Sequence, residues 1–291
     1  MDANAQFSIP WFTIDSGGGS CSGGTFTLNG TIGQPDADQS LTGGSFVVTG
    51  GFWVGEIDDQ CAANIRVADN ELLIDATVGP DNITVTQNGP SLEVEVNDDC
   101  FETFAAIGIE RVVINGFGGA DVIRVNAAVR TLINGGFGAD QIFGSPALSN
   151  EIFGGPGPDT IHGGPLDDVI NAGRGRDTVF AFGGNDTIIG GDASDVLNGG
   201  QGDDEIFGGL GGDTLNGQGG NDLLVGNVGA DILDGGAGND ELTGLGGPDQ
   251  MFGGPGDDSF TGGEGFDTFD GGSGEDTALD NGEVEISIEN S

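Results

Sequence analysis

The chain has 291 residues, of which 61 are glycine, and its 48 acidic and 6 basic residues give a formal net charge of −42. Such a charge repels nucleic acid and anionic membrane surfaces and attracts cations, so we exclude nucleic-acid binding and expect a metal ion or a basic surface as partner. No run of 18 apolar residues is present, so we expect no membrane-spanning helix.

Residues 1–60 predict a small antiparallel β unit. The segments 22–30 and 42–50 both contain Gly-Gly-x-Phe and read as strands bounded by glycine turns. The aromatic residues are expected to form a core, or a surface for contact with another chain. The first five residues contain Ala-x-Ala, which suggests the stub of a trimmed secretion signal, with a chance tripeptide as the alternative. The acidic segment 56–60 is the expected boundary.

The three cysteines are Cys21, Cys61 and Cys100, an odd number without the spacing of a zinc site. Cys61 and Cys100 bracket one compact stretch and could pair in an oxidising compartment. Cys21 would then be a single thiol, and the pairing stays open from sequence alone.

Residues 61–115 alternate between apolar and polar positions, with turn signals such as Gly79-Pro80-Asp81. This pattern predicts short strands. Because the end coil of a solenoid would otherwise expose an apolar face, we interpret the region as the irregular first coils that cap the structure downstream.

From residue 154 to residue 279 the chain is an unbroken series of 14 nonapeptide units. The eighth residue of each unit is apolar and is expected to point inward, supplying the core. The sixth residue is always aspartate: Asp159, Asp168, Asp177, Asp186, Asp195, Asp204, Asp213, Asp222, Asp231, Asp240, Asp249, Asp258, Asp267 and Asp276.

These units, for example residues 235–243, resemble the RTX calcium-binding repeat, Gly-Gly-x-Gly-x-Asp-x-apolar-x. Looser units upstream carry Asp121 and Asp140, and a degenerate unit has Asn150 in place of aspartate, so the resemblance covers residues 116–279. It implies an all-β fold, a right-handed parallel β-roll or β-helix solenoid in which two units form one coil. The small N-terminal β unit would precede it, and residues 280–291 would form a capping strand.

The resemblance also implies a calcium site. Each Ca²⁺ would lie between loops one coil apart and bind aspartates 18 residues apart together with glycine carbonyls, giving about a dozen sites along two edges. Hard oxygen ligands of this kind suit Ca²⁺ better than Mg²⁺. The expected aspartate ligands are those of the 14 units plus Asp121 and Asp140. The expected glycines are those at the second position of the units: Gly155, Gly164, Gly173, Gly191, Gly200, Gly209, Gly236, Gly254, Gly263 and Gly272.

Eight residues depart from the repeat pattern. We expect them to weaken the neighbouring ion sites and to leave the fold intact. Alanine replaces the first glycine twice, four residues replace the second glycine, and two replace the third: Ala172 and Ala181; Phe182, Gln218, Asn227 and Leu245; Leu166 and Ala193.

Stacked aspartates repel one another. At a spacing of about 4.8 Å a pair costs roughly 1 kcal/mol even at the dielectric constant of water. A dozen such pairs would cost about as much as the 5–15 kcal/mol net stability of a typical domain. We therefore expect the repeats to fold only with Ca²⁺, after export to an extracellular or cell-surface location.

The sequence suggests two alternatives to a calcium-dependent structural or interaction protein. An enzyme acting on polysaccharides would need a base and a charge neutraliser, but the chain offers the single His162, no lysine and no tyrosine, so we expect no enzyme. A filament, adhesin or surface-layer subunit could assemble with itself or with a matrix component through the N-terminal strands.

Overall fold

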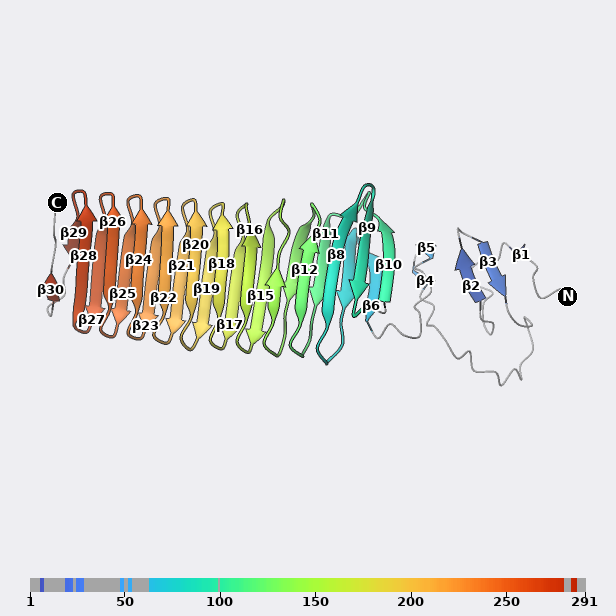
Figure 1. Cartoon of the computed structure of the whole chain (residues 1–291), viewed down its shortest axis with the longest axis horizontal. Helices are drawn as coiled ribbons and strands as arrows, with labels where there is room; N and C mark the ends of the chain where they lie inside the picture. The colour runs from blue at the N-terminus through green and yellow to red at the C-terminus, as the bar shows by residue number, and fades with distance from the viewer. Residues whose placement is uncertain are drawn as a thin grey trace.

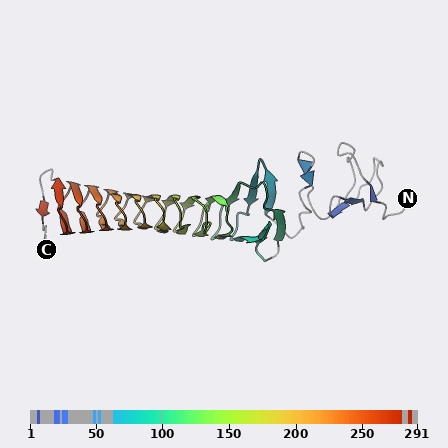
Figure 2. The ribbon, with the colours of Figure 1, turned by 90° about the horizontal axis from the view of Figure 1, so that it is seen from above.

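The computed structural model describes residues 63–98 and 100–279, and six short strand segments outside them. The described chain is all-β without helices, and its coils stack along one long axis (Figures 1 and 2). The predicted parallel β-solenoid is confirmed. In the described residues no helix could span a membrane.

Two sheets form the body of the solenoid. The first has 13 strands in the order β10 (Cys100–Ala105), β9 (Ser91–Val96), β8 (Asn82–Asn88), β12 (Val122–Asn126), β14 (Gln141–Phe143), β16 (Thr160–Gly164), β18 (Thr178–Gly183), β20 (Val196–Gln201), β22 (Thr214–Gly219), β24 (Ile232–Ala237), β26 (Gln250–Pro255), β28 (Asp267–Ser273) and β30 (Val284–Ile286).

The second sheet has 12 strands and supplies the other half of each coil. Its order is β29 (Thr277–Leu279), β27 (Ser259–Glu264), β25 (Glu241–Gly246), β23 (Leu223–Val228), β21 (Glu205–Leu210), β19 (Thr187–Asp192), β17 (Val169–Arg174), β15 (Asn150–Pro156), β13 (Arg130–Asn134), β11 (Arg111–Asn115), β7 (Glu71–Asp75) and β6 (Asn64–Ala68).

Strand pairing is parallel through the repeats and antiparallel only at the N-terminal end of the solenoid. There β6 pairs with β7, and β8, β9 and β10 form a meander. The offset between paired residues falls from 40 (Leu72 with Val112) to 19 (Ile114 with Ile133) and then to 18 (Ile152 with Ile170). The coils upstream of the regular repeats are therefore longer by one or more residues.

The strands of the repeats are longer than the three residues that the glycine pattern suggests. In most units the strand runs from the seventh position into the third position of the next unit, as in β21 and β23. In most units pairing skips the first position and resumes at the second, as the register of Glu205–Leu210 against Leu223–Val228 shows. Glycine does not end the strand because the parallel ladder continues across it.

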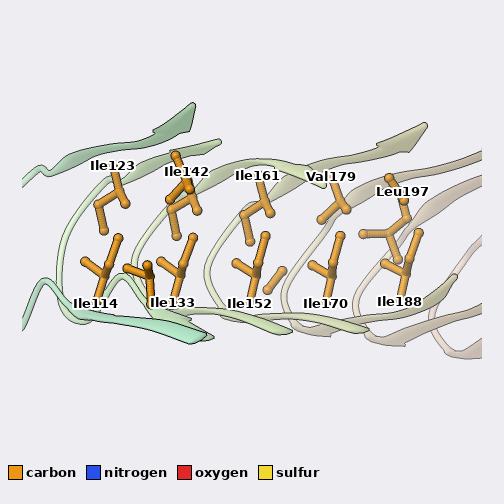
Figure 3. Packing of buried hydrophobic residues seen from close by; sticks show 14 of the residues in the cluster. Ile114, Ile123, Ile133, Ile142, Ile152, Ile161, Ile170, Val179, Ile188 and Leu197 are labelled. Atoms are coloured by element: carbon orange, nitrogen blue, oxygen red, sulfur yellow. The ribbon is translucent and has the colours of Figure 1, made fainter. Parts of the chain in front are cut away.

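The core is a double row of apolar side chains between the two sheets (Figure 3). One row comes from the 12-stranded sheet and includes Ile114, Ile133 and Ile152, and the facing row includes Ile123 and Ile142. All five are 0% exposed. The eighth-position residues are buried from Ile161 to Phe269, which confirms the predicted core, and only Ala278 at the end is partly exposed.

Short antiparallel strands are also present near the N-terminus. One sheet contains β1 (Gln6–Phe7), β3 (Thr25–Leu28) and β2 (Gly19–Ser22), and a separate pair contains β4 (Val48–Thr49) and β5 (Phe52–Trp53). The proposed signal stub, the boundary at 56–60 and Cys61 lie outside the described residues. Cys100 is disulfide-bonded.

Candidate metal centre

The sixth-position aspartates form two ladders, one along each edge of the solenoid. In each step, the backbone N–H of one aspartate donates a hydrogen bond to Oδ1 of the aspartate one coil ahead, as from Asp195 to Asp213 at 2.8 Å. One ladder runs through Asp81, Asp121, Asp140, Asp159, Asp177, Asp195, Asp213, Asp231, Asp249 and Asp267. The other runs through Asn150, Asp168, Asp186, Asp204, Asp222, Asp240, Asp258 and Asp276.

The second oxygen of these carboxylates is buried without a hydrogen-bond donor. Fifteen such Oδ2 atoms occur: those of Asp121, Asp140, Asp159, Asp168, Asp177, Asp186, Asp195, Asp204, Asp213, Asp222, Asp231, Asp240, Asp249, Asp258 and Asp276. All but Asp276 belong to side chains at most 2% exposed. A buried carboxylate without a counter-charge is strongly unfavourable, so the chemistry of this row of oxygens fits bound cations.

Burial is the largest cause of the raised pKa values of the ladder aspartates. It raises the pKa of Asp186 to about 8 and the pKa of Asp195 to about 7. The hydrogen bond from the preceding aspartate N–H lowers the pKa in each case, and the charges of neighbouring aspartates raise it by a smaller amount. Repulsion between stacked aspartates, the cost expected from the sequence, comes after desolvation in the structure, because the side chains are buried in the turns.

Backbone carbonyls of the loops lie beside the unpartnered oxygens. At Gly208, the first residue of its unit, a Cβ atom would lie 2.6 Å from Oδ2 of Asp213 and 2.7 Å from the carbonyl oxygen of Gly226, one coil ahead. At Gly154 the corresponding distances, to Asp159 and Ala172, are 2.6 and 2.5 Å. A carboxylate oxygen and a carbonyl oxygen therefore lie close to the same Cα. Only glycine, which has no Cβ, leaves both oxygens in place.

This arrangement fits a calcium ion. Ca²⁺ takes six to eight oxygen ligands from carboxylates and carbonyls with flexible geometry. Within the described residues no group of three or more His, Cys, Asp and Glu side chains is placed to hold a metal, so backbone oxygens would have to complete the ligand set. The residues that would hold the ion are the sixth-position aspartates and the first-position residues of the adjoining coils.

The predicted second-position glycines serve the loop conformation. Nine of the ten have positive φ, as at Gly191 (φ 118°), and Gly164 is the exception. A side chain on Gly191 would collide with the carbonyl of Gly173 in the preceding coil. The replacements at this position keep the same backbone, with φ between 75° and 81°: Phe182, Gln218, Asn227 and Leu245. The fold therefore survives these departures.

Sequence reasoning missed the first-position glycines, which lie closest to the unpartnered oxygens. The signal was available, since glycine fills the first position in 12 of 14 units and the second in only 10. It also missed Asp81, which begins one ladder.

Both ladders begin at a residue whose oxygens have protein donors. Oδ2 of Asp81 accepts hydrogen bonds from the backbone N–H and the hydroxyl of Thr77, at 2.8 and 2.7 Å. Oδ1 of Asn150 accepts from the hydroxyl of Thr131 and from the N–H of Ser145, at 2.7 and 2.6 Å. These two ends need no cation.

The single histidine is packed among aromatic rings. His162 stacks on Phe143 with ring centres 4.6 Å apart and on Phe180 at 5.2 Å. Burial lowers the pKa of its imidazole.

Comparison with known proteins identifies the repeats. A family model described as the RTX calcium-binding nonapeptide repeat (4 copies) matches residues 132–146, 147–179, 180–215, 207–242, 216–251 and 243–278, which together span about half of the chain. No curated protein matches the chain. Taken with the two aspartate ladders, this match shows that the chain belongs to the RTX calcium-binding repeat family.

Proposed function

We propose that the chain is a secreted, non-enzymatic calcium-binding protein whose solenoid folds when it binds Ca²⁺ outside the cell. The observation that carries the proposal is the set of 15 buried Oδ2 atoms without donors. Bound calcium supplies the positive charge that these carboxylates lack. The sixteen predicted aspartates and the loop carbonyls would hold it at about a dozen sites along the two edges.

The backbone satisfies only one oxygen of each carboxylate. In the folded coil each Oδ1 accepts the N–H of the preceding ladder residue, at 2.6–3.0 Å through both ladders. The other oxygen is left buried and ionised at a cost. A chain that must bury fifteen such groups gains little from folding without a cation, which supports folding on binding.

Export is supported by chemistry that suits the outside of the cell. Extracellular calcium modules bind with dissociation constants of about 10⁻⁴ to 10⁻³ M, far above cytosolic calcium levels. The disulfide at Cys100 persists in oxidising compartments. The chain would therefore remain unfolded inside the cell and fold after release.

A calcium titration of the whole chain tests the proposal. Far-UV circular dichroism and hydrodynamic radius are measured from chelator to 10 mM Ca²⁺, with Mg²⁺ as the control ion. We expect gain of β signal and compaction with a midpoint of about 10⁻⁴ to 10⁻³ M in Ca²⁺ and little change in Mg²⁺. An unchanged spectrum and radius in chelator would show that folding does not depend on calcium.

A second candidate function is assembly through the N-terminal strands, and the antiparallel pairs β2–β3 and β4–β5 support it because short sheets offer free edges. Deletion of residues 1–60 should then abolish association while calcium-induced folding persists. Light scattering at saturating Ca²⁺ decides the question: a full-length chain that stays monomeric at high concentration argues against assembly.

A further inference from the structure

One coil of the solenoid differs from the others at both edges. In units 172–180 and 181–189, which together make one turn, the first residue is alanine. Ala172 and Ala181 are 0% exposed, and their units keep the regular hydrogen bonds from Asp159 to Asp177 and from Asp168 to Asp186. The ladders therefore pass through this coil unbroken, with a methyl group where the neighbouring units have only a hydrogen.

The methyl group changes the oxygens around it. Where the first residue is glycine, a Cβ would lie only 2.5–2.7 Å from Oδ2 of the aspartate and from the carbonyl ahead, as at Gly154, Gly190 and Gly208. Real Cβ atoms do not approach oxygen so closely, so both oxygens must retreat by several tenths of an ångström beside Ala172 and Ala181. Calcium–oxygen distances lie within about 2.3–2.6 Å. One methyl group therefore disturbs two of the oxygens expected to bind the ion.

The beginning of one ladder carries a Cβ at the same position. Ala76 lies five residues before Asp81, and the oxygens of Asp81 have protein donors, including Thr77. Asn150, which begins the other ladder, lies beside Gly144 and also has protein donors. Asp177 and Asp186 have a buried Oδ2 without a donor, as the other ladder aspartates do, and differ from them in the alanine at the first position.

Apolar contacts reinforce this coil from outside. Phe180 and Phe182, on β18, stack against His162 with ring centres 5.2 and 5.7 Å apart, and His162 stacks in turn on Phe143. Phe182 adopts φ 81° to reach this place. Within the described residues this is the one series of stacked rings along the outside of the solenoid, and it lies at the alanine coil.

We propose, building on the calcium-binding function proposed above, that residues 172–189 form a calcium-free coil dividing the array into two blocks. The N-terminal block contains Asp121, Asp140, Asp159 and Asp168. The C-terminal block contains the aspartates from Asp195 to Asp276. The methyl groups of Ala172 and Ala181 exclude calcium from the sites of Asp177 and Asp186, and the aromatic stack holds the coil together in its place.

Calcium stoichiometry of the full chain tests the division. Bound calcium per chain is measured by equilibrium dialysis with metal analysis at saturating Ca²⁺ for the wild type, Ala172→Gly, Ala181→Gly and the double variant. Each single variant should bind one more ion than the wild type, and the double variant two more. Ala237→Gly, at an exposed third position, is the matched control and should not change the number.

The reverse substitution, Gly208→Ala, keeps the test decisive if the Ala172→Gly and Ala181→Gly variants fold poorly. The φ of Gly208 lies outside the left-handed region, so alanine can adopt its backbone, and this variant should bind one ion fewer. Unchanged stoichiometry in Gly208→Ala, or in the well-folded double variant, would overturn the division. A wild-type chain that binds no calcium would instead refute the proposed function itself.

Discussion

Replacing Asp213 by asparagine should have opposite effects with and without calcium. Asp213 is 1% exposed, its Oδ1 accepts the N–H of Asp195 at 2.8 Å, and its Oδ2 has no donor. Asparagine keeps the Oδ1 acceptor and the shape of the side chain. It removes the charge and puts an NH₂ group, which cannot bind a metal, where Oδ2 was.

The sizes of the two effects follow from the structure. Burial raises the pKa of Asp213 from 3.8 to about 6, so ionising it in the metal-free solenoid at pH 7 costs about 3 kcal/mol. Asparagine avoids that cost and incurs about 1 kcal/mol for burying its amide, a net gain of about 2 kcal/mol. With calcium, losing one site of Kd about 10⁻⁴ M at 10 mM Ca²⁺ removes about 2.7 kcal/mol of stability.

Two measurements separate the effects. In calcium-depleted protein, far-UV circular dichroism against pH should place the folding midpoint of Asp213→Asn higher than that of the wild type, because one proton fewer is needed. In 10 mM Ca²⁺ at pH 7, urea unfolding should show lower stability for the variant. Asp270→Asn, an exposed change of the same charge on β28, should alter neither result by much. Equal destabilisation of Asp213→Asn in calcium-depleted protein and in 10 mM Ca²⁺ would refute the role of Asp213 as a ligand and leave a purely structural role.

Three further predictions concern pH, the core and the cap. Burial raises the folded-state pKa values above 3.8, to about 7 for Asp159 and about 8 for Asp186. The metal-free fold should therefore be most stable below pH 3.8 and lose stability as the pH rises to about 8. A β signal that grows with pH in calcium-free buffer would contradict this. Ile206→Ala should cost 2–5 kcal/mol in saturating calcium and Ile206→Val about 0.5–1.5 kcal/mol, measured by urea unfolding, since Ile206 is 0% exposed. Thr77→Val removes the hydroxyl donor to Asp81 and should lower the free energy of unfolding by about 1–3 kcal/mol, measured by urea unfolding, with unchanged calcium stoichiometry. Loss of a bound ion in this variant would show that Asp81 is a ligand.

The sequence alone determined the architecture of the repeats. A period of nine with one apolar residue per unit requires a strand and a turn in every unit, and two units per coil place the eighth-position side chains, such as Leu215 and Leu224, in facing rows. The same period stacks the sixth-position aspartates 18 residues apart, as Asp195 and Asp213 are. These features follow from local repetition, so no knowledge of distant contacts was needed.

The tertiary structure alone decided how the aspartates are used. Only the stacked loops show that Oδ1 of Asp213 is bonded to the backbone while Oδ2 is buried without a donor, and that the carbonyl of Gly226 lies beside it. The antiparallel cap and the 40- and 19-residue offsets upstream were likewise beyond the pattern, because they depend on irregular segments. Burial and hydrogen-bond satisfaction are properties of neighbouring coils together, and no single nonapeptide contains them.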